Sequence, residues 1–319
     1  MPNSILVVIP AQESHKKLLE AAAPDANFIY STPKTVTPEQ VRDADVIVGN
    51  VPAAMIAASP KLKLLQLNSA GTDAYIKPGV LAPQTVLTNA TGAYGKAVAE
   101  HLFAMGFAIQ KKLHLYRDDQ NACVWGDEGT VSSISDATVL VVGLGDIGTH
   151  FARMAKALGA YTIGVKRRAS APIEGVDEIA LTEDLDKLLP RADIVASFLP
   201  GTGATRGMYN AERFQLMKPT AIFLNGGRGG AVDTDALVAA LENGTIFAAG
   251  LDVTDPEPLP ADHPLWKVRN AVVTPHISGG FHLPETFERI VGIAARNLAH
   301  FTAGEAFENE VDFTTGYRK

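Results

Sequence analysis

The stretch TVLVVGLGDIGTHFARMAKALGAYTIGVKRR, residues 138–168, contains in order a strand, a glycine-rich turn, a helix and a second strand. Its first five residues form an apolar, β-branched run of the kind found in buried parallel strands. Gly143, Gly145 and Gly148 follow in a G-x-G-x-x-G pattern. Apolar side chains then recur at helical spacing, which predicts a helix with one buried face. This order is typical of the first βα unit of a doubly wound parallel sheet.

The glycine pattern by itself is a weak signal, and the flanking strand and helix strengthen it. Gly143 allows the tight turn, Gly145 lets the backbone approach a pyrophosphate, and Gly148 lets helix and strand pack closely. The helix N-terminus offers N–H groups to phosphate. We expect a dinucleotide site that includes Asp146 and Ile147, the alternative being an ordinary βα turn. The carboxylate of Asp146 is unfavourable beside a pyrophosphate unless it points away.

The second strand ends in Lys166, Arg167 and Arg168. An acid that binds the adenosine ribose is expected about 20 residues beyond the glycine turn. A carboxylate there accepts hydrogen bonds from the 2′-hydroxyl of NAD, whereas basic side chains pair with a 2′-phosphate. The cluster therefore favours NADP(H), with NAD(H) as a further candidate. The alternative is a solvated basic loop.

Similar apolar runs occur along the whole chain of 319 residues, in two series. The runs predict strands within 4–10, 26–31, 44–50, 62–69 and 85–91, and then within 138–143, 161–167, 193–200, 220–226, 247–253 and 270–277. Helical patterns occupy 95–117 and 285–302, and a Gly-rich polar connection spans 121–136. The recurrence predicts an α/β chain with two parallel-sheet halves.

Bulk composition limits the functional class. Hydrophobic residues make up 46% and charged residues 20%, and the net charge is −7. These values are typical of a globular protein and argue against a nucleic-acid surface or an anionic membrane as the main partner. Cys123 is the single cysteine, so no intrachain disulfide is expected and no metal site is predicted. No leader or membrane-spanning pattern is evident, which favours a cytoplasmic enzyme.

Arg228, Glu257 and His276 form a second group of candidate residues. Each lies shortly after an apolar strand, and open parallel sheets bind ligands at the carboxyl ends of their strands. Arg binds a carboxylate and polarises an adjacent carbonyl, His moves a proton, and Glu orients the imidazole. Taken singly, a histidine near a strand end is more often structural, and Glu257 fits a surface position.

The chain closely resembles the D-isomer-specific 2-hydroxyacid dehydrogenases, a family that includes glyoxylate/hydroxypyruvate reductases. The resemblance covers nearly the whole chain. It is carried by LLQLNSAGTDAYI (64–76), TNATGAYGKAVAEHLFAMGFA (88–108), GLGDIG (143–148), FLPGTGATRGMYNAERFQLMKPTAIFLNGGRGGAVD (198–233) and DHPLWKVRNAVVTPHISGG (262–280). The last two segments are specific signatures of the family.

The resemblance implies roles for particular residues. Arg228 matches the substrate-binding arginine, Glu257 the acid paired with the catalytic histidine, and His276 the acid–base histidine. Asp252 matches the acid that usually holds the nicotinamide carboxamide. Ala70 and Gly71 match the loop whose backbone amides are expected to hold the substrate carboxylate, and Tyr94 lies near the expected substrate loops. The Glu100–His101 pair is also common in the family, where it has no chemical role.

The family architecture implies two Rossmann-like or flavodoxin-like domains that flank an active-site cleft. We expect a substrate domain from 1–101 and 285–319 and a dinucleotide-binding domain from 102–284. The family is usually homodimeric through the dinucleotide-binding domain. Lys166 departs from the common pattern in the way that the family's NADPH-using reductases do.

Together these features predict a reductase that converts a small 2-oxoacid to a D-2-hydroxyacid with NADPH. Two alternatives stay open. One is an NAD-dependent dehydrogenase that works in the oxidative direction. The other is a non-catalytic NAD(P)H-sensing protein similar to the corepressors of this superfamily. The sequence leaves the side chain of the substrate undetermined.

Overall fold

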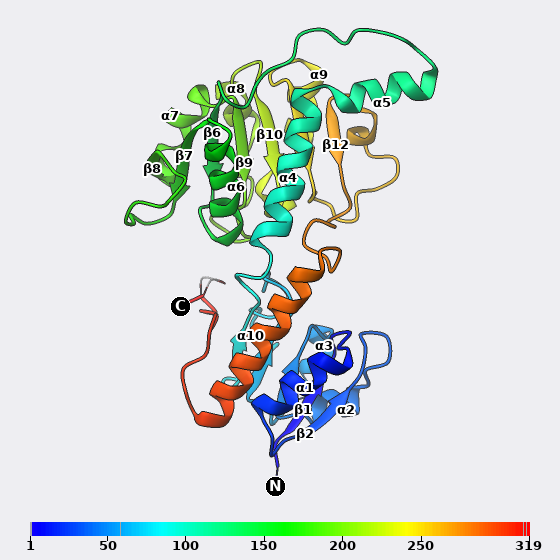
Figure 1. Cartoon of the computed structure of the whole chain (residues 1–319), viewed down its shortest axis with the longest axis vertical. Helices are drawn as coiled ribbons and strands as arrows, with labels where there is room; N and C mark the ends of the chain where they lie inside the picture. The colour runs from blue at the N-terminus through cyan, green and yellow to red at the C-terminus, as the bar shows by residue number, and fades with distance from the viewer. Residues whose placement is uncertain (1, 58, 315, 317) are drawn as a thin grey trace. The chain divides into compact units, whose positions relative to one another are not determined.

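The computed structural model describes residues 2–57, 59–314, 316, 318 and 319. The chain forms two compact units, unit 1 from residues 1–94 and 283–319 and unit 2 from residues 95–282 (Figure 1). We expected unit 2 to begin at 102, whereas it begins with helix α4 (Gly95–Gln110). The whole of α4 belongs to unit 2 because it packs on helix α6 and strands β10 and β11 of that unit.

Unit 1 is built on a parallel sheet with the strand order β2-β1-β3-β4-β5. Its strands are β1 (Ser4–Val7), β2 (Asn27–Tyr30), β3 (Val46–Val48), β4 (Leu64–Gln66) and β5 (Val86–Thr88). Its helices are α1 (Glu13–Ala22), α2 (Pro38–Arg42), α3 (Ala53–Ile56) and α10 (Pro284–Ala303). Helices α1, α2 and α3 follow β1, β2 and β3 in turn, as parallel crossovers require, whereas β4 and β5 are joined by a segment without a helix.

The strands of unit 1 are apolar on both faces, and alternate residues enter opposite layers of the core. Ile5 and Val7 pack with Leu19 of α1 and Val291 of α10. Leu6 packs on the opposite face with residues of α2 and α3. Helices α1 and α10 lie side by side although they come from opposite ends of the chain (Figure 1). The sheet is therefore buried on both faces, as parallel sheets generally are.

Unit 2 is built on a longer parallel sheet with the order β12-β11-β10-β9-β6-β7-β8. Its strands are β6 (Thr138–Val142), β7 (Tyr161–Lys166), β8 (Glu178–Leu181), β9 (Ile194–Ser197), β10 (Ile222–Asn225), β11 (Ala248–Leu251) and β12 (Ala271–Val273). The remaining helices are α5 (Leu113–Ala122), α6 (Asp146–Ala157), α7 (Leu185–Leu188), α8 (Ala211–Leu216) and α9 (Thr234–Glu242), with short 3-10 turns η1 (Thr182–Asp184), η2 (Leu189–Arg191), η3 (Gly229–Ala231) and η4 (Pro264–Lys267).

Helices cover both faces of this second sheet. Residues of α7, α8 and α9 pack with β6, β7, β9, β10 and β11 in one large apolar cluster. Helices α4 and α6 pack together on the other face, where the tilted rings of Phe103 and Phe151 are in contact and Phe198 packs against Phe151. The order of strands reverses at β6, with β7 on one side and β9 on the other. Ligands of doubly wound sheets bind at this kind of switch point.

Every run expected to be a strand contains one, so the prediction of two parallel α/β sheets is confirmed. Two details were wrong. Strand β8 was not expected, because its half-exposed residues at the sheet edge give no continuous apolar run. The helix expected over 95–117 is two helices, because Lys112 adopts a left-handed backbone with φ of 56° between α4 and α5.

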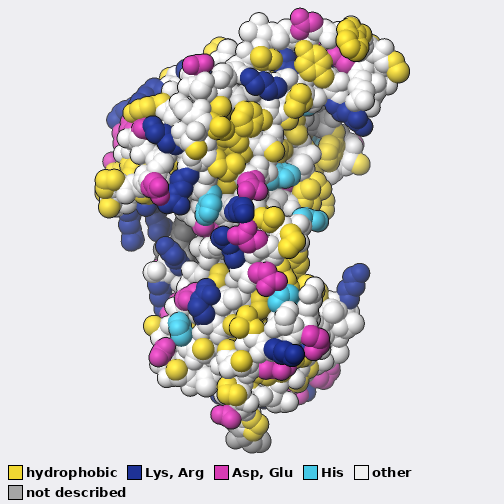
Figure 2. All heavy atoms as spheres, in the orientation of Figure 1, with side chains coloured by type: hydrophobic (Ala, Val, Ile, Leu, Met, Phe, Trp, Pro, Cys, Tyr) yellow, Lys and Arg dark blue, Asp and Glu magenta, His cyan; other side chains and the backbone are white. Residues whose placement is uncertain are grey.

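The surface carries mixed charges. On the face in Figure 2, acidic and basic side chains alternate over both units, and Lys and Arg gather along the edge of unit 2 near β7 and β8. Within the described residues, no helix is long and apolar enough to cross a membrane.

Candidate active site

The glycine turn lies directly after β6, at the switch point of the second sheet. Gly143 has a φ of +103°, which L-residues with a side chain rarely adopt. A Cβ added to Gly148 would lie 2.1 Å from the carbonyl oxygen of Gly143. Helix α6 can therefore start this close to β6 because residue 148 has no side chain. The sequence pattern and the local backbone agree on this turn.

Open space adjoins the same turn. A Cβ added to Gly145, the residue before α6, would meet no protein atom within 4 Å. The first N–H groups of α6, a helix of 12 residues, have no partners within their own helix. Their unpaired donors and the helix dipole make this position suited to an anionic group. The residues present thus fit the pyrophosphate of a dinucleotide.

Asp146 is the first residue of α6, and its carboxylate is directed toward a neighbouring helix. Its Oδ1 lies 3.5 Å from Nδ1 of His150, and a Cβ added to Gly95 of α4 would lie 2.5 Å from the same oxygen. The Asp146 side chain is 20% exposed. The carboxylate therefore lies against the start of α4 and beside His150, which removes part of the objection to an acid in this turn.

The basic cluster begins where β7 ends. Lys166 is the last residue of β7, and its backbone carbonyl accepts a hydrogen bond from Thr182 Oγ1 at 3.3 Å. Arg167 and Arg168 are exposed in the following loop. Strand β7 is the neighbour of β6, so the basic cluster and the glycine turn follow the carboxyl ends of adjacent strands. This is the placement that a 2′-phosphate beside the adenosine ribose requires.

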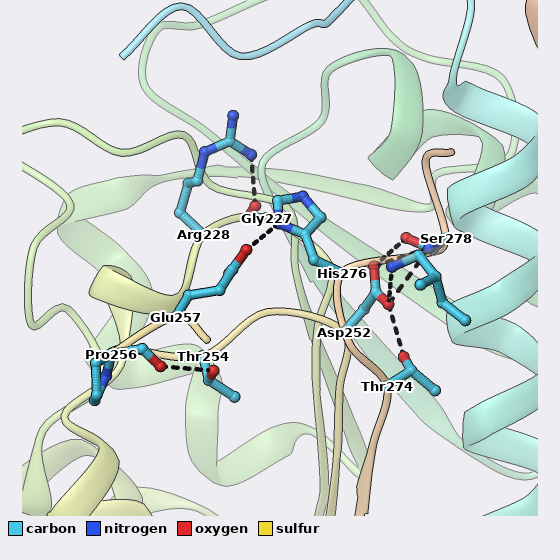
Figure 3. A network of polar contacts seen from close by, with 10 residues as sticks. Gly227, Arg228, Asp252, Thr254, Pro256, Glu257, Thr274, His276 and Ser278 are labelled. Atoms are coloured by element: carbon cyan, nitrogen blue, oxygen red, sulfur yellow. Dashed lines mark hydrogen bonds and ion pairs between the residues drawn. The ribbon is translucent and has the colours of Figure 1, made fainter. Parts of the chain in front are cut away.

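Arg228, Glu257 and His276 follow three neighbouring strands of the same sheet. Arg228 follows β10, Glu257 lies in the loop after β11, and His276 follows β12. The strands are parallel and paired in that order, so their carboxyl ends share one edge of the sheet. Residues far apart in the sequence are brought to one place by this strand order. Figure 3 shows the three side chains gathered beyond the strand ends.

The closest polar contact of this group joins His276 and Glu257. Nδ1 of His276 lies 2.6 Å from Oε1 of Glu257, and the two side chains are 44% and 42% exposed. The carboxylate accepts from Nδ1 and leaves Nε2 of the imidazole for another partner. Arg228 donates from Nη1 to the carbonyl oxygen of Gly227 at 2.9 Å (Figure 3). The arrangement combines a histidine oriented by an acid with a guanidinium on the neighbouring loop.

Asp252, expected to contact the nicotinamide, is buried. It is 1% exposed, and its carboxylate accepts hydrogen bonds from Thr274 Oγ1 at 2.6 Å and from the backbone N–H of Ile277 at 3.0 Å. Ser278 donates to it from both the backbone N–H and the hydroxyl. A carboxylate has about four lone-pair sites, so these donors occupy most of its capacity. Asp252 thus ties together the segment that carries His276 (Figure 3).

In unit 1, the expected substrate loop follows β4. The Ala70 carbonyl accepts from Asn89 Nδ2 at 2.9 Å, and the Gly71 carbonyl accepts from Ser69 Oγ at 2.8 Å. Asn50 donates to the Ser69 hydroxyl at 3.0 Å. Asn89, after β5, holds the loop at the Ala70 carbonyl, and Asn50, after β3, holds it through the Ser69 hydroxyl. Sequence reasoning missed Asn50 and Asn89, although each is a polar residue directly after an apolar strand.

Tyr94 is held within unit 1. Its hydroxyl donates to the backbone carbonyl of Asn68, two residues after the end of β4. The side chain is buried, and burial raises the pKa of its phenol well above the ordinary value. Tyr94 therefore holds the loop after β4 through a neutral hydroxyl. Its expected contact with substrate stays a prediction.

Over the part of the chain that the structure describes, no group of three or more His, Cys, Asp or Glu side chains is placed to hold a metal ion.

Two doubly wound parallel sheets, one with a dinucleotide-type glycine turn and an Arg–Glu–His group at its strand ends, define a nucleotide-dependent oxidoreductase class. The sequence model of the D-isomer specific 2-hydroxyacid dehydrogenase NAD binding domain matches residues 103–278. The chain belongs to the D-isomer specific 2-hydroxyacid dehydrogenase family. It is therefore an oxidoreductase of the NAD(P)-dependent 2-hydroxyacid dehydrogenase type.

Individual relatives agree with this family. A glyoxylate/hydroxypyruvate reductase B of Shigella boydii is 33% identical over 269 residues, which cover 82% of each protein. A family member from Aeromonas salmonicida has a solved structure that is 31% identical, with a TM-score of 0.85 over 98% of this chain and 100% of that one. An NADPH-dependent glyoxylate/hydroxypyruvate reductase from Sinorhizobium meliloti, solved with NADP and sulfate, is 26% identical, with a TM-score of 0.83 over 99% of this chain and 100% of that one.

Proposed function

We propose that this protein uses NADPH to reduce a small 2-oxoacid to the D-2-hydroxyacid. The observation that carries the proposal is the 2.6 Å contact between His276 Nδ1 and Glu257 Oε1. Arg228 follows β10, the strand next to the one that precedes Glu257. These residue types supply what a carbonyl reduction needs, namely a proton for the oxygen and a positive charge for the carboxylate. When bound, the nicotinamide cofactor supplies the hydride.

The three residues have different tasks in the proposed reaction. Arg228 binds the substrate carboxylate in a fork and polarises the adjacent ketone. His276 gives a proton from Nε2 to the carbonyl oxygen as negative charge develops there. Glu257 accepts from Nδ1, which fixes the ring orientation and points Nε2 outward. In the reverse direction, His276 takes the proton from the hydroxyl.

Unit 1 supplies the second part of the substrate site. The backbone N–H groups of Ala70 and Gly71 are proposed to hold the carboxylate together with Arg228. Hydrogen bonds to the carbonyls of Ala70 and Gly71 immobilise this loop. A fixed loop places its amides without the entropy cost of ordering them at each turnover. Tyr94 is proposed to contact the substrate from the same region.

The cofactor preference rests on the cluster after β7. Gly143, Gly145, Ile147 and Gly148 form the turn that would hold the pyrophosphate, with Gly145 at the point of closest approach, and Asp252 would contact the nicotinamide carboxamide. Lys166, Arg167 and Arg168 pair with the 2′-phosphate of NADPH, where a carboxylate would instead select NAD(H). The Sinorhizobium meliloti relative, an NADPH-dependent reductase solved with NADP, supports this preference. Because several relatives are named glyoxylate/hydroxypyruvate reductases, glyoxylate and hydroxypyruvate are the first substrates to test.

The test compares NADPH and NADH oxidation with glyoxylate, hydroxypyruvate, pyruvate and an aromatic 2-oxoacid at neutral pH. We expect turnover with NADPH well above that with NADH. The double variant Lys166→Asp and Arg167→Ser is expected to shift the ratio toward NADH. A persistent NADPH preference in the variant would reduce the basic cluster to a solvated loop.

The same assay separates the alternatives. An NADH preference together with faster oxidation of D-2-hydroxyacids would favour the NAD-dependent dehydrogenase. Tight NADPH binding without turnover of any 2-oxoacid would favour a non-catalytic sensor. Homodimer formation and a cytoplasmic location stay predictions, and light scattering of the purified protein tests the dimer.

A further inference from the structure

We propose that His101 is a positioning residue for His276 and acts through Thr274 and Asp252. The four side chains come from α4, from the end of β12 and from the end of β11. Nε2 of His101 lies 3.0 Å from Thr274 Oγ1, which lies 2.6 Å from Asp252 Oδ1. The inference rests on the proposed role of His276. It adds that helix α4, which is distant from His276 in sequence, helps to fix the backbone conformation of that residue.

Asp252 binds the His276 segment from two sides. Its backbone carbonyl accepts from the N–H of His276 at 2.8 Å. Its carboxylate accepts from the N–H groups of Ile277 at 3.0 Å and Ser278 at 3.2 Å. Three consecutive backbone N–H groups therefore end on one buried residue, as Figure 3 shows for the carboxylate. The orientation of Asp252 sets the course of the chain through residue 276.

His276 needs such support because its backbone is in an unfavourable region. Its φ is +50°, in the left-handed region that residues other than glycine seldom adopt. Such a conformation persists only where the surrounding contacts hold it, and it is common at functional sites. The hydrogen bonds from residues 276–278 to Asp252 are these contacts. If Asp252 turns, the backbone of His276 is free to relax and its ring leaves Glu257.

The direction of the hydrogen bonds links His101 to this support. Thr274 has one hydroxyl proton, and the short contact with Asp252 Oδ1 is favourable if that proton points at the carboxylate. The Thr274 oxygen then accepts, so Nε2 of His101 is the donor. The opposite order would place the Thr274 oxygen against the carboxylate with no proton between them. His101 thus selects the hydroxyl rotor that holds Asp252.

The distances favour hydrogen bonds from His101 through Thr274 to Asp252 over a direct ion pair between His101 and Asp252. Nε2 of His101 is 3.8 Å from Asp252 Oδ1, farther than the Thr274 hydroxyl that lies between them. The side chain of His101 is 27% exposed. It is therefore accessible enough to be replaced without a change to the buried core, in contrast to Asp252.

The experiment uses two matched pairs of variants in the full-length protein. Thr274→Val removes the hydroxyl at nearly constant shape, and Thr274→Ser retains it. His101→Phe removes the donor, and His101→Gln keeps an N–H donor close to the position of Nε2. We expect Thr274→Val and His101→Phe each to lower kcat about 10- to 100-fold, because a small displacement of a reacting group has effects of that order. Thr274→Ser and His101→Gln should retain most of the activity.

The double variant decides between positioning and general stability. If His101 acts through Thr274, then His101→Phe combined with Thr274→Val lowers kcat no further than Thr274→Val alone. Fluorescence titration should give an NADPH affinity within a few-fold of the wild type, since the glycine turn and the basic cluster are untouched. Independent losses that multiply in the double variant, or equal losses in the conservative variants, would overturn the proposal.

A crystal structure of Thr274→Val separates this inference from the proposed function. We expect the His276 Nδ1 to Glu257 Oε1 distance to lengthen from 2.6 Å and the φ of His276 to leave +50°. Both changes are observable even if the wild type reduces no 2-oxoacid, a result that would defeat the proposed function alone. If the His276–Glu257 distance and the φ of His276 are unchanged in that variant, the positioning role of His101 and Thr274 is refuted.

Discussion

The two units of this protein each contain a doubly wound parallel sheet, but the residues at their strand ends differ. In unit 1, the strand order reverses at β1, and the connection from β1 to α1 contains no glycine. In unit 2, the order reverses at β6, and the connection to α6 is the glycine turn. A doubly wound sheet by itself therefore leaves the chemistry open. Unit 2 has a glycine turn after β6, where we propose that phosphate binds, and unit 1 has a loop held by Asn50 and Asn89.

The contrast extends to the polar side chains. In unit 1, Asn50 donates to the Ser69 hydroxyl, and Ser69 and Asn89 donate to the loop carbonyls of Gly71 and Ala70. Glu257 and His276 in unit 2 are paired to each other and are more than 40% exposed. The groups that hold the loop are satisfied within the protein, whereas the groups proposed to do the chemistry keep an exposed side. The following predictions, in order of decreasing effect, test this division.

The largest effect is expected for His276→Ala. Loss of general acid catalysis should lower kcat by about 10²- to 10⁴-fold. The affinity for NADPH should stay close to that of the wild type, because the proposed phosphate contacts lie in the glycine turn after β6 and the basic cluster after β7. Steady-state kinetics with a 2-oxoacid and a direct NADPH titration measure the two quantities. His282→Ala, at an exposed histidine of the same unit, is the control. An unchanged kcat would remove His276 from the mechanism.

Two glycine variants distinguish the contribution of the turn to the stability of unit 2 from its contribution to NADPH binding. Gly148→Ala should destabilise the protein by about 1–3 kcal/mol, since its Cβ would lie 2.1 Å from a backbone oxygen. Gly145→Ala should leave the melting temperature nearly unchanged, because its Cβ meets no protein atom within 4 Å. It should nevertheless weaken NADPH binding by about tenfold or more, or ~1.4 kcal/mol.

Thermal melts and NADPH titrations of both variants provide the comparison. If Gly145→Ala binds NADPH like the wild type, the open space beside the turn is not the pyrophosphate site.

In unit 1, Asn89→Ala tests whether the braced loop serves the substrate. Asn89 is 3% exposed, and its removal leaves the Ala70 carbonyl without its donor. We expect a loss of about 1–3 kcal/mol in the free energy of unfolding and a raised KM for the 2-oxoacid. The NADPH affinity should not change. Gln84→Ala, which removes an exposed amide in the same unit, is the control. A lower NADPH affinity with an unchanged KM would contradict the division of tasks.

The smallest effect concerns acid stability. Asp177 holds α6 to β7, since it pairs with Lys156 at 2.6 Å and accepts from the N–H of Thr162 at 2.9 Å. The Lys156 hydrogen bond is the main reason that the pKa of Asp177 lies below its ordinary value of 3.8. A lowered pKa in the folded state means that the contribution is fully present above 3.8 and is lost as the pH falls through the lower, folded pKa.

Asp177→Asn should therefore destabilise the protein by up to about 1 kcal/mol at pH 7, with the difference from wild type vanishing in strong acid. Urea unfolding at several pH values measures this difference. Asp184→Asn removes an exposed partner of Lys187 and should have a smaller effect at every pH. A difference that grows toward low pH would contradict the assignment.

Local patterns in the sequence determined a large part of this protein. The apolar runs located the strands of both sheets except β8, because a buried parallel strand is apolar along its whole length and an edge strand is not. The turn at Gly143 and Gly148 was predictable because strand, turn and helix are consecutive in sequence. The resemblance supplied roles for Arg228, Glu257 and His276, and two of them, Arg228 and His276, lie within contiguous signature segments.

Only the tertiary structure decided which side chains meet. The contacts of His101 with Thr274, of Asp252 with the segment after His276, and of Asn89 with Ala70 join residues from different strand ends or helices. No periodicity records such pairs, because they depend on strand order and on the direction of each loop. The left-handed backbone at Lys112 and His276 is likewise imposed by surrounding contacts against the preference of the residue itself. Sequence determined the elements and the types of residue available for chemistry, and the packed strand ends determined how those residues are held.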